Sequence, residues 1–213
     1  DIVENIVKKP IHIRYTSKPI SSVESFGRYH VITLGKTKGV DKFTLLNHEA
    51  GHILFNSPTK SGEQMITQWA QEWKADPFVP LDTLKEIYWG ALNMIEDQRI
   101  ESLMAKLYLN NKKRFYNAKV HVGREYKCMA YTPFLVLGYT RFLRDDLIEE
   151  WDKCHNMAKK ILKEVEGTGQ RGALIGLAKF KPFIDKYITQ CIEEEQEISI
   201  GVDYTPLEYN EVG

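Results

Sequence analysis

Residues 48–52 read His-Glu-Ala-Gly-His, a set of residue types that can bind a metal ion and activate water. Residues four apart lie one above the other on a helix, so the imidazoles of His48 and His52 can reach the same ion. Glu49 lies close to that face and can hydrogen-bond a water molecule instead of binding the metal. Zinc lowers the pKa of such a water, and the carboxylate takes its proton. The spacing therefore predicts a zinc site with His48 and His52 as ligands and Glu49 as general base.

Catalytic zinc usually has three protein ligands, so the two histidines need a third residue. We expect this residue to be Glu96, because it is the only charged residue on an apolar stripe of a long predicted helix, and a buried carboxylate needs a cation or a metal as its partner. A salt bridge from Glu96 to an arginine or lysine is the alternative explanation. The stripe consists of Trp89, Leu92, Glu96, Ile100, Leu103 and Leu107.

The neighbouring stripe of the same helix is mostly polar and contains Asp97, about 100° around the helix from Glu96. The two carboxylates are therefore not expected to enter the same coordination shell. Asp97 is suited to accept the outer ring N–H of a ligating histidine. This stripe consists of Glu86, Gly90, Asn93, Asp97 and Glu101.

The segments HEAGH at 48–52 and NMIEDQRIE at 93–101 resemble the zinc-binding motifs of the gluzincin group of metallopeptidases. They are most similar to the metallopeptidase-like domains found beside von Willebrand A-type domains in microbial and viral proteins, and the match covers residues 41–56 and 88–104. The resemblance implies His48, His52 and Glu96 as zinc ligands and Glu49 as base. Some related domains have only an aspartate at this place in the helix, so the resemblance also keeps Asp97 open as a ligand.

The function that follows is zinc-dependent hydrolysis of peptide bonds in a peptide or protein substrate. The alternative is a catalytically inactive zinc-binding module that acts through its contacts. By analogy with zincins, residues 29–35 are a candidate strand for binding peptide along a sheet edge. Four residues in the region that we expect to be irregular are candidates for stabilising the oxyanion, and the sequence does not choose among them. They are His121, Arg124, Tyr126 and Tyr131.

Composition excludes several other classes of protein. The chain has 213 residues, of which 43% are hydrophobic and 27% are charged, as in an ordinary soluble domain. Lysine plus arginine and aspartate plus glutamate both number 29, and this balance disfavours nucleic-acid binding, which needs a basic excess. No apolar run approaches the ~18 residues of a membrane span, and the first residues lack a signal-peptide core. Three widely spaced cysteines indicate a reducing compartment, so we expect a cytoplasmic location.

The expected fold is α+β and predominantly helical, with a zincin-like pair of active-site helices and a small antiparallel sheet near the N-terminus. Strands are expected within 10–40, a solvated connection at 110–114 and an irregular segment or short strand over 116–130. Residues 1–196 are expected to form one domain. The alternating tail at 197–213 is expected either to pair with the sheet, the cleft or an adjacent domain absent from this chain, or to be a frayed terminus. The expected helices span 41–56, 61–75, 81–109, 133–166 and 172–196.

Overall fold

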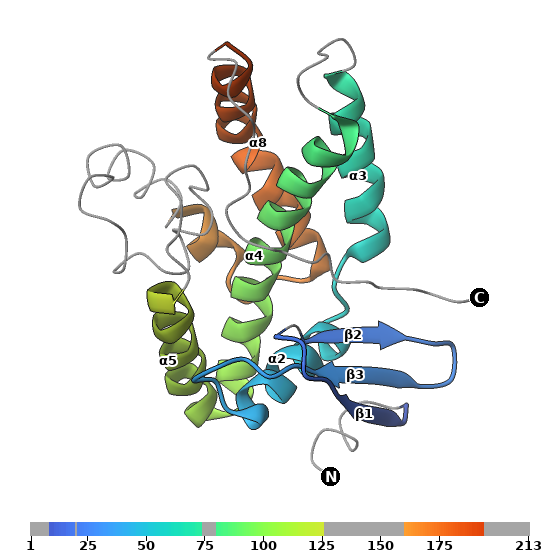
Figure 1. The fold of residues 1–213 in the computed structure, drawn as a ribbon, viewed down its shortest axis with the longest axis vertical. Coiled ribbons are helices and arrows are strands. Elements are labelled where there is room, and N and C mark those ends of the chain that lie inside the picture. Colours follow the sequence, from blue (N-terminus) through green and yellow to red (C-terminus); the bar gives the residue numbers. More distant parts are fainter. Residues whose placement is uncertain (1–8, 20, 74–79, 126–159, 194–213) are drawn as a thin grey trace.

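The computed structural model describes residues 9–19, 21–73, 80–125 and 160–193. Within these residues the fold is α+β and mostly helical, with a small sheet near the N-terminus (Figure 1). The strands are β1 (Ile11–Tyr15), β2 (Ser22–Ser25) and β3 (His30–Leu34). The long helices are α2 (Lys42–Leu54), α3 (Thr59–Glu72), α4 (Leu81–Leu107), α5 (Leu109–Glu125) and α8 (Gln170–Glu193).

The three strands form a mixed sheet in the order β1-β3-β2, not the antiparallel sheet that we expected. A short connection joins β2 to β3, so these two strands run antiparallel, whereas β1 pairs in parallel with the other edge of β3. Because β3 is hydrogen-bonded on both edges, it has no free edge for a peptide. The expectation that residues 29–35 bind substrate as an edge strand is therefore wrong.

Helix α2, which carries the HEAGH motif, begins at a well-formed cap. The Asp41 side chain accepts hydrogen bonds from the Thr44 backbone N–H at 2.9 Å and from the Thr44 hydroxyl at 2.7 Å, as a helix N-cap residue commonly does. Ala50 of α2 packs against apolar side chains of β2 and β3 in a small core. The sheet thus holds one side of the motif helix in place. The sheet residues of this core are Val23, Ile32 and Leu34.

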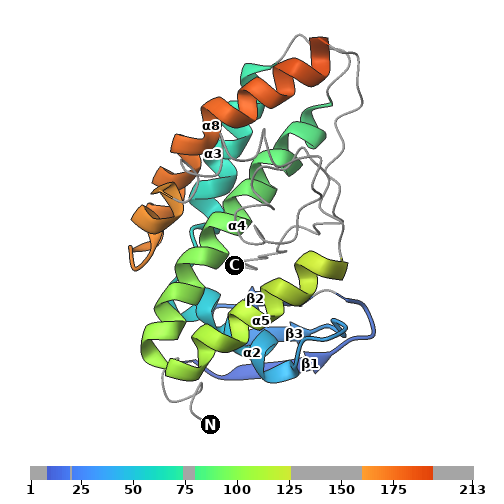
Figure 2. The same ribbon diagram turned by 90° about the vertical axis from the view of Figure 1, so that its left-hand side faces the viewer.

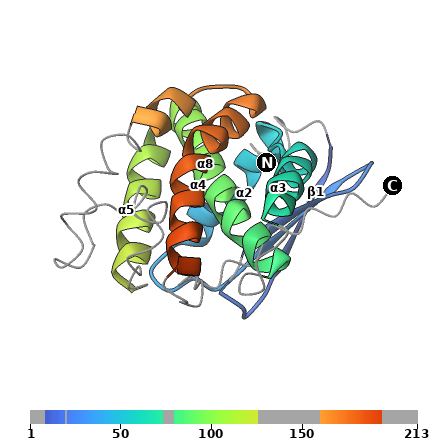
Figure 3. The same ribbon diagram turned by 90° about the horizontal axis from the view of Figure 1, so that it is seen from above.

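Helix α4 extends through both the upper and the lower part of the molecule in Figure 2. Its N-terminal half packs with α3 and α8 in the main hydrophobic core, and its C-terminal half lies beside α2 and α5. The view from above shows α4 surrounded by these helices, with the sheet outside α2 (Figure 3). Representative core residues are Ile66, Tyr88, Leu92, Ile95, Leu177 and Ile184.

Gly51, inside the HEAGH motif, lies where α2 packs against α4. A Cβ atom placed on Gly51 would lie 3.2 Å from Met104 Cγ and 3.3 Å from Ile100 Cδ1. These distances are tighter than ordinary van der Waals contact, so a larger side chain would push the helices apart. The glycine therefore allows Ile100 and Met104 of α4 to pack closely against α2.

The expected irregular segment at 116–130 is wrong over its described part, because α5 continues without interruption to Glu125. Asn111 and Phe115, four residues apart, are both buried, so one face of α5 packs inward. The basic residues at 112–114 are exposed, but they belong to this helix and not to a connection.

Other sequence expectations lie largely outside the described residues. Of the helix expected over 133–166, the structure describes a helical stretch at 160–165, and the tail at 197–213 is not described. The last helix begins at Gln170, two residues before its expected start. Among the described helices, none is long and apolar enough to cross a membrane.

Candidate metal centre

Two histidines of α2 and one aspartate of α4 form a compact group of potential metal ligands. The Nε2 atoms of His48 and His52 lie 3.3 Å apart, and Asp97 Oδ1 lies 3.5 Å from the first and 3.4 Å from the second. In tetrahedral coordination with bonds of ~2.0–2.1 Å, two ligand atoms lie ~3.3–3.4 Å apart. The three side chains therefore form the nearly equilateral triangle that tetrahedral coordination requires.

Glu96, the residue expected to be the third ligand, lies outside this triangle. Its carboxylate accepts two hydrogen bonds from Arg99, from Nε at 2.7 Å and from Nη2 at 2.6 Å, and both side chains are buried. This is the salt bridge that the sequence left as the alternative explanation. We therefore replace Glu96 by Asp97 in the candidate ligand set.

The reason for the replacement is the face of α4 that meets the motif helix. Asp97, Ile100, Glu101 and Met104 follow one another at the i, i+3, i+4, i+7 spacing of a single helix face. Gly51 contacts the two apolar members of this face, and His48 contacts the two acidic ones. The preceding part of the Glu96 stripe is turned elsewhere: Trp89 and Leu92 lie beside Gly62 of α3, and Glu96 itself contacts Ser57 in the connection that follows α2.

Each histidine is held by a second contact at its other ring nitrogen. His48 Nδ1 lies 3.1 Å from Glu101 Oε1, and His52 Nδ1 lies 2.8 Å from Ser57 Oγ. Orienting contacts of this kind fix the ring nitrogen that faces a metal. The role that we expected for Asp97 thus belongs to Glu101. The four-residue spacing from Asp97 on the polar stripe is the signal that could have revealed it.

The electrostatic field around the imidazoles favours positive charge. Burial by itself lowers the pKa of His48, but Asp97, the hydrogen bond with Glu101 and the charge of Glu49 raise it, to about 10. Three carboxylates therefore surround this imidazole. A divalent cation would be stabilised by the same charges.

Glu49 is buried beside the two imidazoles, with 3% of its surface exposed. Within the part of the chain that the structure describes, its Oε2 atom has no hydrogen-bond partner. Burial raises the pKa of this carboxyl above its usual value, although the neighbouring histidines oppose the rise. A carboxylate with a raised pKa and an oxygen that has no partner among the described residues is suited to accept and return a proton.

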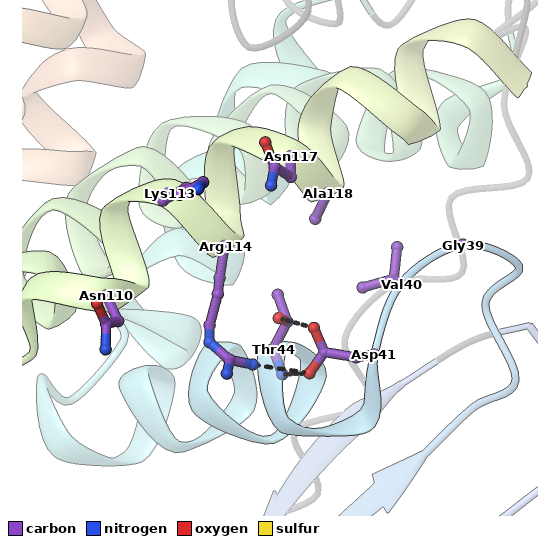
Figure 4. Close-up of a pocket in the computed structure, with 9 residues that line it drawn as sticks. All are labelled: Gly39, Val40, Asp41, Thr44, Asn110, Lys113, Arg114, Asn117 and Ala118. Atoms are coloured by element: carbon purple, nitrogen blue, oxygen red, sulfur yellow. Dashed lines mark hydrogen bonds and ion pairs between the residues drawn. The ribbon is translucent and has the colours of Figure 1, made fainter.

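A cavity of about 350 Å³ lies between the start of α2 and the side of α5 (Figure 4). Thr44 lines it and precedes His48 by four residues, so the cavity borders the helix face that carries the first histidine. Arg114 reaches from α5 to Asp41, with 3.1 Å between the guanidinium and the carboxylate (Figure 4). The rest of the lining includes polar side chains, among them Asn110 and Lys113. The cavity therefore suits a ligand with polar groups.

The four candidates for oxyanion stabilisation are not decided. His121 and Arg124 belong to the last turns of α5, where the side chains are outside the described part of the structure. Tyr126 and Tyr131 lie outside the described residues. An oxyanion-stabilising group from this region stays a prediction.

Comparisons with protein-family models, curated proteins and solved structures find no match to this chain. The resemblance to gluzincins therefore stands only on the two short motifs, and the candidate centre stands on its geometry.

Replacing Arg99 with methionine is expected to destabilise the fold. The guanidinium is 1% exposed, binds Glu96 and donates to the backbone oxygens of Phe55 and Thr168 at 2.9 and 3.1 Å. Its loss leaves a buried carboxylate without its cation, which typically lowers the free energy of unfolding by ~3–5 kcal/mol. Urea denaturation measures this change. The double variant Glu96→Gln/Arg99→Met is the control and should recover part of the loss, whereas a single-variant loss below ~1 kcal/mol would contradict the assignment.

Proposed function

We propose that this protein is a zinc-dependent peptidase whose ligands are His48, His52 and Asp97 and whose general base is Glu49. The observation that carries the proposal is the triangle of ligand atoms with sides of 3.3, 3.4 and 3.5 Å. Beside it lies a buried carboxylate, one oxygen of which has no hydrogen-bond partner among the residues that the structure describes. Three protein ligands leave one position open, which distinguishes catalytic zinc sites from closed structural ones.

The donor set also favours zinc over harder cations. Two imidazole nitrogens and one carboxylate oxygen are typical of zinc and of other late transition metals, whereas magnesium and calcium prefer oxygen ligands alone. Zinc bound by these residues would supply a Lewis acid that polarises a substrate carbonyl and makes water more acidic.

The other steps of the proposed reaction are assigned to residues of the chain. Glu49 takes a proton from the attacking water and gives it to the nitrogen of the departing amine. Glu101 orients His48 through its hydrogen bond to Nδ1. In this proposal, the polar cavity beside Thr44, one helical turn before His48, would hold part of the peptide.

Removal and return of the metal test this proposal. The purified protein should contain one zinc per chain by elemental analysis, and it should cleave members of an unbiased peptide mixture, with products identified by mass spectrometry. A chelator should remove the zinc and abolish cleavage, and added zinc should restore the metal content and the cleavage, because the metal would supply the Lewis acid for the reaction.

Two outcomes would count against it. Protein that takes up no zinc at micromolar free metal would refute the metal centre. Protein that holds zinc tightly but cleaves nothing would refute the peptidase and favour the zinc-binding interaction module.

A further inference from the structure

The connection that follows α2 folds back onto the second histidine of the motif. Asn56 has a positive φ of 50°, and the Ser57 backbone N–H donates to the His52 carbonyl oxygen at 3.1 Å. This turn places the Ser57 hydroxyl 2.8 Å from His52 Nδ1. The same hydroxyl donates to Glu96 Oε1 in a short hydrogen bond.

The hydroxyl of Ser57 has a single proton, and this determines the direction of both hydrogen bonds. Glu96, paired with Arg99, acts as a carboxylate that only accepts, so the hydroxyl proton must point to Glu96. Ser57 Oγ can then only accept from His52, which places a proton on Nδ1. The lone pair of His52 is left on Nε2, the atom that faces His48 and Asp97.

We infer that Arg99, Glu96 and Ser57 form a hydrogen-bonded chain that fixes the tautomer and the orientation of His52 for metal binding, with Ser57 as a positioning residue. The inference rests on the proposed function, since it gives His52 a metal to bind. It also explains the burial of Glu96 without making it a ligand. Arg99 donates to the Glu96 carboxylate, and this carboxylate accepts the proton of the Ser57 hydroxyl. The Ser57 oxygen then accepts from Nδ1 of His52 and fixes the orientation of the ring.

The test compares zinc affinities by competition with a chromogenic chelator. Ser57→Ala should weaken zinc binding ~10–100-fold, as the loss of an outer contact to a ligating histidine typically does. Ser57→Cys keeps the size of the side chain but hydrogen-bonds weakly, so it should show a similar loss. Ser57→Thr keeps the hydroxyl and should bind zinc nearly as the unmodified protein does.

Ser25→Ala is the matched control, because Ser25 makes the same kind of contact, 2.6 Å from His30 Nδ1, within the sheet. This variant should leave zinc affinity unchanged. A second readout is the proton on His52 Nδ1, observed by ¹H–¹⁵N NMR of the zinc-loaded protein. It should be protected from exchange in the unmodified protein and in Ser57→Thr, and it should exchange rapidly in Ser57→Ala and Ser57→Cys.

Unchanged zinc affinity and an unchanged Nδ1 proton in both Ser57→Ala and Ser57→Cys would overturn the inference and leave the peptidase proposal intact. Failure of the unmodified protein to bind zinc would refute the proposed function instead. The two failures are therefore distinguishable.

Discussion

Glu49→Gln is expected to reduce peptide cleavage by ~10²–10⁴-fold, the usual contribution of a positioned general base, while the protein keeps its zinc. Glutamine has nearly the size of glutamate but cannot accept and return the proton. Because Glu49 lies outside the triangle of candidate ligand atoms, its replacement removes a neighbouring charge but no ligand, and it should weaken zinc binding far less than the loss of a ligand does. Turnover of a peptide substrate and zinc competition with a chelator measure the two quantities separately.

Glu63→Gln on helix α3 is a suitable control, because the same change of charge then occurs on an exposed side chain. It should leave both quantities unaltered. Full activity in Glu49→Gln would show that another group serves as the base. A parallel loss of zinc and activity would place Glu49 among the ligands and contradict its assigned role.

Asp97→Ala is expected to abolish tight zinc binding, with a loss of more than the ~100-fold that outer contacts typically contribute. The reason is that Asp97 Oδ1 lies within 3.5 Å of both Nε2 atoms and closes the triangle. Activity should disappear with the metal. Competition with a chromogenic chelator measures the affinity, and elemental analysis confirms the metal content.

Glu96→Gln is the informative comparison for Asp97→Ala, since the two residues are neighbours on one helix. Its effect on zinc should be smaller and indirect, because Glu96 reaches His52 only through Ser57. It should also lower the free energy of unfolding, because Arg99 loses its buried anion. If Glu96→Gln loses its zinc while Asp97→Ala keeps it, the ligand assignment is reversed. The hydrolase proposal would still stand in that case.

The local features of the motif could be predicted from the sequence. The four-residue spacing of His48 and His52 places their rings on one helix face whatever the rest of the chain does. The helix expected over 41–56 opens with Asp41, a residue type common at helix N-caps, and the structure shows Asp41 as the cap. The burial of Glu96 was also predictable, because its stripe is otherwise apolar.

Neighbouring segments of the sheet and of α5 were less predictable. The parallel pairing of β1 with β3 depends on which edge of a hairpin the first strand joins, and alternation within a strand contains no such information. Helix α5 is rich in polar residues, so its buried face, marked by Asn111 and Phe115, gives a weak periodic signal.

The choice between two adjacent carboxylates was made by tertiary structure alone. Periodicity fixes the angle between Glu96 and Asp97 on their own helix, but not how that helix is rotated against another one. The rotation is set by the packing of α4 against α2, where the absence of a side chain at Gly51 leaves room for Ile100 and Met104. Because α4 is surrounded by several helices, two of its faces are buried, and burial cannot tell which of them meets the histidines. The sequence thus determined that a buried carboxylate would lie near the motif, and the packing of α2 on α4 decided that Asp97 faces the imidazoles while Glu96 is paired with Arg99.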